Sequence, residues 1–454
     1  MSKSNLFSEF NDVSTQQWKQ KIQFDLKGKD YNECVVWESL EGIKVKPFYN
    51  SEDTCIKNAI PTPLKPWSIT QAIYAGHEEI ANKKAIKALQ KGAESILFTI
   101  PNEKVSIALL LKNIDPQQIV FYFDFQFISA TYSTIANEFL SSVGAKFYFN
   151  VDIIHHLTTS GNWHTNSEED FLQFDAVAAN TNTLTLDATN YQNAGANLVQ
   201  QLAYSLAHAN EYLNRIPEAN ISSFSINFKI AIGSNYFFEI AKIRALRLLY
   251  KTLAAAYGAP ENCHILAVTT KRNKTLYDYN SNMLRSTTEC MSAILGSADA
   301  VCNLPYDVIY HKSNDFAERI ARNQLIILKE ESYFDKTNNP ADGSYYIESL
   351  TKQLADKALE LFKELEKGGG FLSQLKANTI QKKIKESAQK EQDLFDCKKL
   401  ILVGTNKYES SLDKMKGDLE LFPFAKNKPR KSSIEPIIER RLSEAIEQKR
   451  LENE

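Results

Sequence analysis

Short β-prone runs recur along the middle of this 454-residue chain, and segments of helical periodicity separate most of them. Because parallel strands are joined by crossovers that usually contain a helix, this alternation predicts parallel βα units. Several runs are apolar almost throughout, which is typical of strands covered on both faces. Seven runs are clear, at residues 94–100, 118–125, 146–154, 183–188, 225–233, 263–270 and 298–305, and residues 172–180 are the candidate for an eighth.

This number of βα units favours the α/β class and, within it, a (β/α)₈ TIM barrel. An open doubly wound sheet is the alternative, and its nucleotide-binding form is weakened because neither GxGxxG nor GxxxxGK[ST] follows any run. We expect three parts: an N-terminal arm at 1–65, the barrel at 66–370, and a C-terminal segment at 371–454 with one strand (398–408) and a terminal helix (434–451). The arm is aromatic and too short for its own core, so it should pack on the barrel or on another chain.

Charge and hydropathy exclude several classes of partner. The formal net charge of −2 gives no general attraction to nucleic acid or to an anionic membrane. No apolar run approaches the roughly 18 residues of a membrane span, and the N-terminus lacks the apolar core of a signal peptide. No CxxC pair is present, so the cysteines are expected to be reduced and buried, at positions 34, 55, 263, 290, 302 and 397. We predict a cytoplasmic protein without a nucleic-acid or membrane partner.

Candidates for metal or proton chemistry are few. His155 and His156 follow a predicted strand, and His164 is near them. Adjacent side chains point to opposite faces of a strand, or about 100° apart on a helix, so the first two cannot easily share one ion. With no HExxH and no cysteine close by, hydrogen-bonded or surface histidines are the favoured interpretation, and we expect no metal site. Glu78 and Glu79 suit the first turn of a helix better than a general-acid role.

The segment LDATNYQNAGANLVQQLAYSLAHANEYL (186–213) joins a β-prone run to a long amphipathic helix through a polar tip. Chemistry in α/β enzymes is usually placed at such a junction. The tip consists of Asn190, Tyr191, Gln192 and Asn193, and it holds no His, Asp, Glu, Lys or Cys. Asparagine donates and accepts hydrogen bonds but cannot become a cation, so this loop lacks a general acid or base.

Several ordered segments resemble the methylmalonyl-CoA mutase family from about residue 15 to the end of the chain. They are LKGKDYNECVVWESLEGIKVKPFYNSEDT (26–54), YQNAGANLVQQLAYSLAHANEYL (191–213), IGSNYFFEIAKIRALRLLY (232–250), RNQLIILKEES (322–332), GSYYIESLT (343–351) and LVGTNKY (402–408). The signature residues that we expect to be mainly structural are Gln192, Gly195, Gly233, Lys242, Arg244, Gly343 and Tyr345.

The resemblance implies a (β/α)₈ barrel threaded by acyl-CoA, with a second, flavodoxin-like domain that presents cobalamin over the barrel mouth. It also implies isomerase chemistry: a radical rearrangement that interconverts methylmalonyl-CoA and succinyl-CoA, in which the cofactor carries the hard step. The DxHxxG motif whose His ligates cobalt in the family is absent, and only 46 residues follow Tyr408. We therefore expect no cobalamin-binding domain in this chain.

Three segments that carry the family's chemistry differ here. A Tyr-His pair precedes the Gln-x-Ala-Gly-Ala segment in active members, where the His hydrogen-bonds the thioester; Thr189 and Asn190 occupy these positions. The region of the radical-steering Tyr reads ITQAIYAG, which leaves Tyr74 as a remnant. The Ser-Gln-Thr-Ser-Gly segment that helps to bind CoA has become TTKRNKT (269–275). No catalytic or cofactor-binding residue is therefore expected in this chain.

The resemblance and its departures predict a small, non-catalytic subunit of a heterodimeric mutase. It would stabilise a large subunit that holds adenosylcobalamin, and the aromatic arm with Trp18, Trp37, Phe48 and Tyr49 would reach across to that partner. One alternative is the catalytic, acyl-CoA-binding chain of a split mutase whose cobalamin is carried on a separate protein. Another is a chaperone-like protein that guards a mutase, which the absence of a P-loop disfavours.

Overall fold

Eight parallel strands form a nearly closed barrel, which confirms the α/β class and the (β/α)₈ architecture. The computed structural model describes residues 9–11, 13–53, 60–63, 65–426 and 429–454. Strand order in the sheet is β6-β5-β4-β3-β10-β9-β8-β7, and β6 lies beside β7 at the seam. The strands are β3 (Ser68–Tyr74), β4 (Ser95–Ile100), β5 (Val120–Phe125), β6 (Lys146–Asn150), β7 (Thr183–Asp187), β8 (Ser225–Ile232), β9 (His264–Thr269) and β10 (Ala300–Cys302).

The seven clear β-prone runs are all strands, but the eighth strand is β3 and not residues 172–180. Those residues lie in α7 (Ser167–Thr181), which begins where the Asn166 side chain accepts a hydrogen bond from the Glu169 amide at 3.0 Å. Phe174, Val177 and Ala178 form its buried face at helical spacing, so the period and not the apolar content identifies the element.

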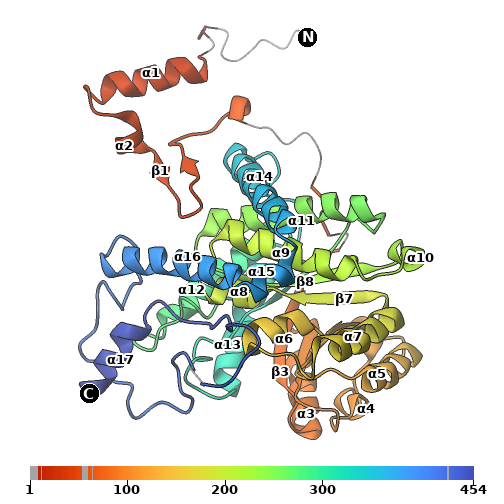
Figure 1. Ribbon diagram of the computed structural model, residues 1–454. Helices are drawn as coiled ribbons and strands as arrows, with labels where there is room; N and C mark the ends of the chain where they lie inside the picture. The colour runs from red at the N-terminus through yellow and green to blue at the C-terminus, as the bar shows by residue number, and fades with distance from the viewer. Residues whose placement is uncertain (1–8, 12, 54–59, 64, 427–428) are drawn as a thin grey trace, which may run out of the picture.

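Helices cover the outside of the barrel (Figure 1). The outward strand residues, such as Ile96 and Phe98, pack beneath this layer in the main cores. The helices that follow the strands are α3 (Glu78–Gln90), α5 (Ala130–Ser142), α6 (Ile153–Ser160), α7, α9 (Leu198–Leu213), α11 (Tyr236–Tyr257), α12 (Ser281–Leu295) and α13 (Asp315–Ile326). A second layer packs on α9 and α11; it consists of α14 (Tyr345–Lys367) and α15 (Phe371–Lys376), followed by α16 (Thr379–Asp396).

The barrel axis is filled by side chains. Leu97, Leu266 and Val268 point inward and form a separate core with Tyr122. The ring of Tyr122 stacks on that of Tyr148 at a centroid distance of 5.5 Å. His264 closes the group, with its Nε2 atom 2.8 Å from the Tyr122 hydroxyl and its ring 4.5 Å from that of Tyr148. A ligand could enter the barrel axis only if the inward side chains were small. Here three large rings occupy that space.

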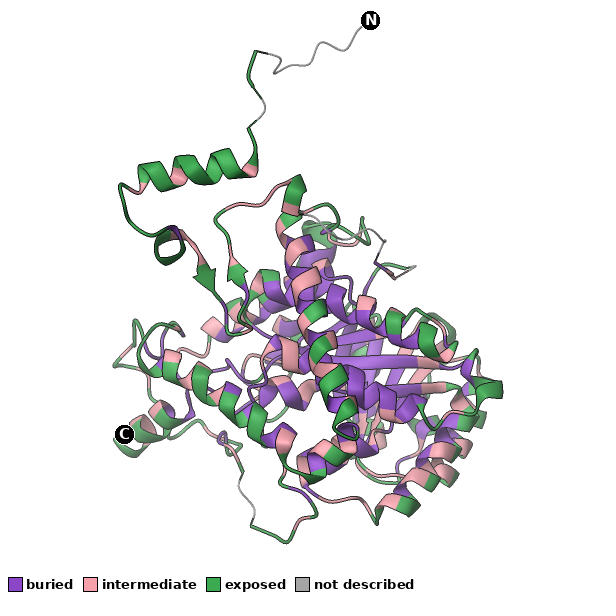
Figure 2. Ribbon diagram, turned by 45° about the horizontal axis from the view of Figure 1, so that its top comes forward, coloured by how far each residue is buried: buried purple, intermediate pink, exposed green. Residues whose placement is uncertain are grey.

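The N-terminal arm projects from the barrel (Figures 1 and 2). It contains α1 (Thr15–Asp25), α2 (Tyr31–Val35) and a hairpin of β1 (Trp37–Glu38) and β2 (Lys44–Val45). No residue of α1 is buried, and the side chains of Trp18 and Phe24 are 47% and 77% exposed. Two aromatic contacts join the arm to the body, Trp37 on Phe238 and Tyr49 on Tyr346, with centroids 5.7 Å and 5.0 Å apart. The part boundaries placed at residues 65 and 370 stay a prediction.

The C-terminal segment differs from the sequence-based expectation. Residues 398–408 form no strand beyond one isolated bridge between Val403 and Lys407, because Asn406 closes the chain into a turn by accepting from the Leu402 amide at 2.9 Å. The predicted helix at 434–451 is reduced to α17 (Glu444–Glu452).

Residues 433–443, which we call the strap, run without regular structure along the carboxyl end of the barrel. Their amides donate to carbonyl oxygens at this end of the barrel, from Ile437 to Thr158 of α6 at 2.7 Å and from Leu442 to Arg272, in the loop after β9, at 3.1 Å. These bonds, together with the proline that follows Glu435, compete with a helix.

The cysteines are only partly as expected. Among the described residues, Cys263, Cys290 and Cys302 are free and buried, whereas Cys34 and Cys397 are free and exposed, so the prediction of burial is wrong for these two. Cys55 lies outside the described residues. Within the part of the chain that the structure describes, no helix is both long enough and apolar enough to cross a bilayer.

Candidate functional site

Four polar residues form a layer across the carboxyl end of the barrel interior. Asp124 is the register partner of Asn150, and Asp187 is the register partner of Lys229, so the strand pleat directs all four inward. The Lys229 ammonium lies 2.9 Å from Asp124 and 2.7 Å from Asp187. No sequence pattern predicted this layer, because its four residues lie on four different strands and share no local spacing.

Lys229 and Asp187 of this layer stay charged at neutral pH. Burial acts to lower the pKa of the Lys229 ammonium, but Asp124 and Asp187 raise it above its ordinary value. Burial also disfavours the charge on Asp187, yet Lys229 and His155 hold the pKa of that carboxyl well below its usual range. Neither Lys229 nor Asp187 can exchange a proton with a substrate near neutral pH, so this ion pair is suited to structure and not to acid–base chemistry.

The three histidines of the candidate metal site lie near this layer but do not converge. His155 contacts the carbonyl oxygen of Asp187 through Nδ1 at 2.9 Å. His156 and His164 stack on each other with ring centroids 3.6 Å apart, and burial lowers the pKa of His156 to about 4. Across the described residues, no group of three or more His, Cys, Asp or Glu side chains is arranged to hold a metal ion.

A buried network supports the loop after β7. Asp152 begins α6, and its Oδ1 atom lies 3.0 Å from Nε2 of His208 and accepts from the Tyr212 hydroxyl at 2.6 Å. Its Oδ2 atom accepts from the Asp187 amide at 2.7 Å. The Tyr191 hydroxyl lies 3.1 Å from the other His208 nitrogen. The only sequence signal for this network was the i, i+4 spacing of His208 and Tyr212 on one helix.

Asn190 and its neighbours are engaged within the protein. Asn190 is completely buried in α8 (Thr189–Asn193), and its Nδ2 atom donates to the Thr158 hydroxyl on α6 at 2.8 Å. The Thr270 hydroxyl donates to Gln192 Oε1 at 2.5 Å or to Asn193 Oδ1 at 2.9 Å. The polar tip that resembles an active-site loop thus fixes α8 against α6 and the loop after β9.

Two signature glycines mark close approaches in this region. At Gly195, where φ is +98°, an added Cβ would lie 2.5 Å from Ala388 Cβ and 2.7 Å from a guanidinium nitrogen of Arg272. At Gly233, an added Cβ would lie 2.8 Å from Gln192 Nε2. Both glycines therefore allow close packing against neighbouring side chains, on α16 at Gly195 and on α8 at Gly233.

The remaining signature residues tie two matched segments together. Lys242 is buried and lies 2.5 Å from Glu239. Arg244 is fully buried; it pairs with Glu348 at 2.8 Å and also with Asp342. The amide of Gly343, at φ +80°, donates to Glu348 at 3.2 Å. Segments 232–250 and 343–351 thus form one structural unit.

The side chains of Tyr345 and Tyr74 are exposed. Tyr345 begins α14 and is 43% exposed, and Tyr74, at the end of β3, is 66% exposed.

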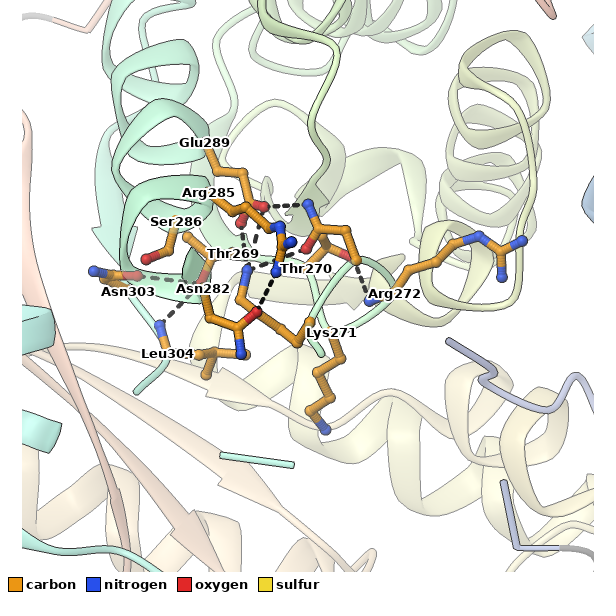
Figure 3. Close-up of polar contacts among 12 residues, drawn as sticks. Thr269, Thr270, Lys271, Arg272, Asn282, Arg285, Ser286, Glu289, Asn303 and Leu304 are labelled. Carbon is orange, nitrogen blue, oxygen red and sulfur yellow. Dashed lines mark hydrogen bonds and ion pairs between the residues drawn. The ribbon is translucent and has the colours of Figure 1, made fainter. Parts of the chain in front are cut away.

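Of the three cations in the TTKRNKT loop after β9, Arg272 and Lys274 pair with acceptors of the protein, whereas Lys271 points away from the contacts drawn in Figure 3. The Lys274 ammonium lies 3.1 Å from the Glu289 carboxylate of α12, and both side chains are completely buried. Arg272 lies on the opposite side of the loop, where it pairs with Glu391 at 2.7 Å and donates to the Arg440 carbonyl oxygen at 2.7 Å. Of the three cations, only Lys271 is largely solvent-exposed, at 46%.

These features define a (β/α)₈ protein whose polar loops at the carboxyl end of the strands are bound mostly to each other. The family model for methylmalonyl-CoA mutase matches residues 152–452, and the chain belongs to this family.

The small subunit of methylmalonyl-CoA mutase from Porphyromonas gingivalis is 34% identical; the alignment covers 89% of this chain and 71% of that protein. A methylmalonyl-CoA mutase of Cereibacter sphaeroides is 28% identical, with 86% and 64% covered. The large subunit from P. gingivalis is 35% identical, but over only 50% of this chain and 33% of that protein.

Proposed function

We propose that this chain is the small, non-catalytic subunit of a heterodimeric methylmalonyl-CoA mutase, and that it stabilises a large subunit that binds adenosylcobalamin. Relatives named as the small and the large subunit of one organism's enzyme support a two-chain assembly. The complex would interconvert methylmalonyl-CoA and succinyl-CoA, and the cofactor would supply the radical chemistry.

The filled barrel carries this proposal. Acyl-CoA is expected to thread the barrel axis in the family, whereas here Tyr122, Tyr148 and His264 pack against each other in that space. Interiors packed in this way do not open without loss of many contacts. The same observation weighs against the alternative, a catalytic chain of a split mutase that would bind acyl-CoA itself.

Two loops support the same conclusion. Asn190, at the position of the family's catalytic His, donates one hydrogen bond from Nδ2 to the Thr158 hydroxyl. The cations Arg272 and Lys274, in the segment expected to contact CoA, are paired with Glu391 and Glu289. A phosphate-bearing ligand would have to break buried ion pairs to gain these side chains, which is unfavourable.

Cobalamin does not fit the described part of this chain. The sequence holds no DxHxxG, and the strap lies across the carboxyl end of the barrel, where the family presents the cofactor. Near that end, Nδ1 of His155 contacts the Asp187 carbonyl oxygen, and the ring of His156 stacks on that of His164. We therefore assign the cofactor to the partner.

The exposed arm is the proposed contact with the partner. Trp18 and Phe24 together place two large apolar side chains in solvent on a helix without any buried residue. Aromatic anchors of this kind often contribute most of the binding energy of an interface.

Co-expression with a large subunit tests the proposal. We expect activity from the mixture or from the large subunit, and none from this chain supplied with adenosylcobalamin. The double variant Trp18→Ala/Phe24→Ala should weaken association at least about tenfold, with no change in the thermal stability of the isolated chain. Leu172→Ala, which alters an equally exposed side chain on α7, is the matched control. Turnover by this chain alone would refute the proposal.

A further inference from the structure

His311 lies between two carboxylates that belong to distant parts of the chain. Its Nδ1 atom lies 3.1 Å from Oδ2 of Asp307, within the loop after β10. Its Nε2 atom forms an ion pair of 3.3 Å with Oδ1 of Asp418, in the C-terminal segment. A neutral imidazole carries one N–H group, whereas an imidazolium carries two. Only the protonated ring can therefore present an N–H group to both carboxylates at once.

The two carboxylates differ in how firmly they are held. The Asp307 side chain is 3% exposed and also accepts a hydrogen bond from Nδ2 of Asn314 at 2.8 Å. The Asp418 side chain is 53% exposed, so water can replace the histidine there. The Tyr310 ring packs on His311 with centroids 4.4 Å apart, and it stays uncharged because burial raises the pKa of its hydroxyl. A neutral His311 should therefore keep its contact with the buried Asp307 and lose the one with Asp418.

Asp418 closes a turn at residues 415–418, where its amide donates to the Met415 carbonyl oxygen at 3.0 Å. Just after the turn, the amide of Glu420 donates to the Tyr310 carbonyl oxygen at 2.9 Å, which joins the segment to the loop after β10 through the backbone. That backbone bond does not titrate, whereas an imidazole contact to Asp418 does. A change in pH should therefore act on the turn and leave the backbone attachment intact.

The charges around His311 favour its protonated form. Burial acts to lower the pKa of His311, but Asp307 and Asp418 raise it above its ordinary value. Glu420, a further carboxylate of the C-terminal segment at this loop, accepts a hydrogen bond from the Lys312 amide at 2.8 Å. Because the pKa is raised on folding, the stabilisation is complete below about pH 6.5 and is lost as the pH rises through the pKa of the folded protein.

We propose that His311 is a pH-dependent clasp, whose protonated ring fixes the turn at 415–418 on the loop after β10 and whose neutral ring releases it. Beyond the turn, residues 421–426 line a groove of about 570 Å³ at the carboxyl end of the barrel, together with Val308 and Ile309 of the loop. The clasp thus connects the two segments that form these walls. It involves no partner and no cofactor, so the inference does not depend on the proposed function.

Hydrogen–deuterium exchange of the full chain tests the release of the turn. Peptides that cover residues 411–420 would be followed at about pH 6 and about pH 8.5, on either side of an ordinary histidine pKa, with correction for the intrinsic exchange rate. We expect protection of the turn to fall about two- to fivefold at the higher pH, the usual size for a partly exposed ion pair. His311→Gln keeps a donor but does not titrate, so its turn should be equally protected at both pH values. His77→Gln, which changes an exposed histidine at the start of α3, should retain the wild-type response.

A second measurement tests the contact itself. The His311 ring would be titrated by NMR with isotope-labelled histidine, and its signals would be assigned by their loss in His311→Gln. Asp418→Asn alters a half-exposed side chain and should leave the fold intact, but it should lower the pKa of His311 and weaken the pH response of the turn. Equal protection of the wild-type turn at the two pH values, an unchanged response in His311→Gln, or the same His311 pKa in wild type and Asp418→Asn would overturn the inference.

Discussion

The ammonium of Lys274 and the carboxylate of Glu289 form an ion pair of 3.1 Å with no solvent exposure on either side chain. Asn273 adds a hydrogen bond of 2.6 Å to the same carboxylate. The pair fixes the loop after β9 to α12. Buried charges are tolerated only when they are paired and hydrogen-bonded, so this contact restricts the loop to one conformation.

Breaking this pair on one side should be costly. We expect Lys274→Met to lower the free energy of unfolding by about 3–5 kcal/mol, because it leaves the Glu289 carboxylate buried and unpaired. The double variant Lys274→Met/Glu289→Gln should recover part of that loss, because no charge then remains. Urea unfolding measures both, and a double variant less stable than the single variant would contradict this account.

Arg244 should not be replaceable by lysine. It pairs with Asp342 and Glu348 and so joins α11 to the start of α14. Because lysine cannot span two carboxylates with a planar fork, Arg244→Lys should cost about 1–3 kcal/mol of stability. Arg215→Lys, at the half-exposed pair with Asp175, should cost less than about 1 kcal/mol. Equal losses in chemical denaturation would show that burial does not matter here.

Gly195 should be intolerant of a side chain for two separable reasons. Gly195→Ala and Gly258→Ala both place alanine at positive φ, which costs about 1–2 kcal/mol. Only at Gly195 does the new Cβ also meet Ala388 and Arg272, whereas nothing lies within 4 Å at Gly258. We expect Gly195→Ala to lose about 1–3 kcal/mol more stability than the Gly258→Ala control. Thermal unfolding of the two variants measures the difference.

His156 should make the chain sensitive to acid. Burial lowers the pKa of His156 to about 4, whereas an unfolded histidine titrates near 6.5, so the unfolded chain binds the proton first. The stability contribution is complete above about pH 6.5 and is lost as the pH falls toward 4. His156→Gln should therefore lose less stability over this range than wild type, and the exposed His77→Gln should behave as wild type. If the free energy of unfolding fell by the same amount over this pH range in all three proteins, His156 would not have this role.

The rings of Tyr122, Tyr148 and His264 should stabilise the fold, and their removal should not open a binding channel. Tyr148→Ala should cost about 3–5 kcal/mol, because its ring packs on Tyr122 and His264. Tyr122→Phe removes only the hydrogen bond to His264 and should cost about 1 kcal/mol. Neither variant should acquire affinity for succinyl-CoA in calorimetry. Tight binding by Tyr148→Ala would revive the alternative in which this barrel accepts acyl-CoA.

Sequence patterns predicted the parts of the molecule whose cause is local. The seven apolar runs were recognisable because a strand buried on both faces leaves a continuous signature. Trp18 and Ile22 of α1 are likewise four residues apart, a helical spacing, and three glycines follow α14 at 368–370. The errors at 172–180, 398–408 and 434–443 occurred where apolar content suggested one element but helix caps or loop contacts selected another.

The sequence by itself determined the alternation of strands and helices and the residue types at the loop tips, including an asparagine at position 190. Only the tertiary structure decided what those residues face: Asn190 meets Thr158, Lys274 meets Glu289, and Tyr148 closes the axis. The reason is physical. Periodicity depends on neighbours within one or two turns, whereas partners inside a barrel are brought together by strand register across tens to hundreds of residues.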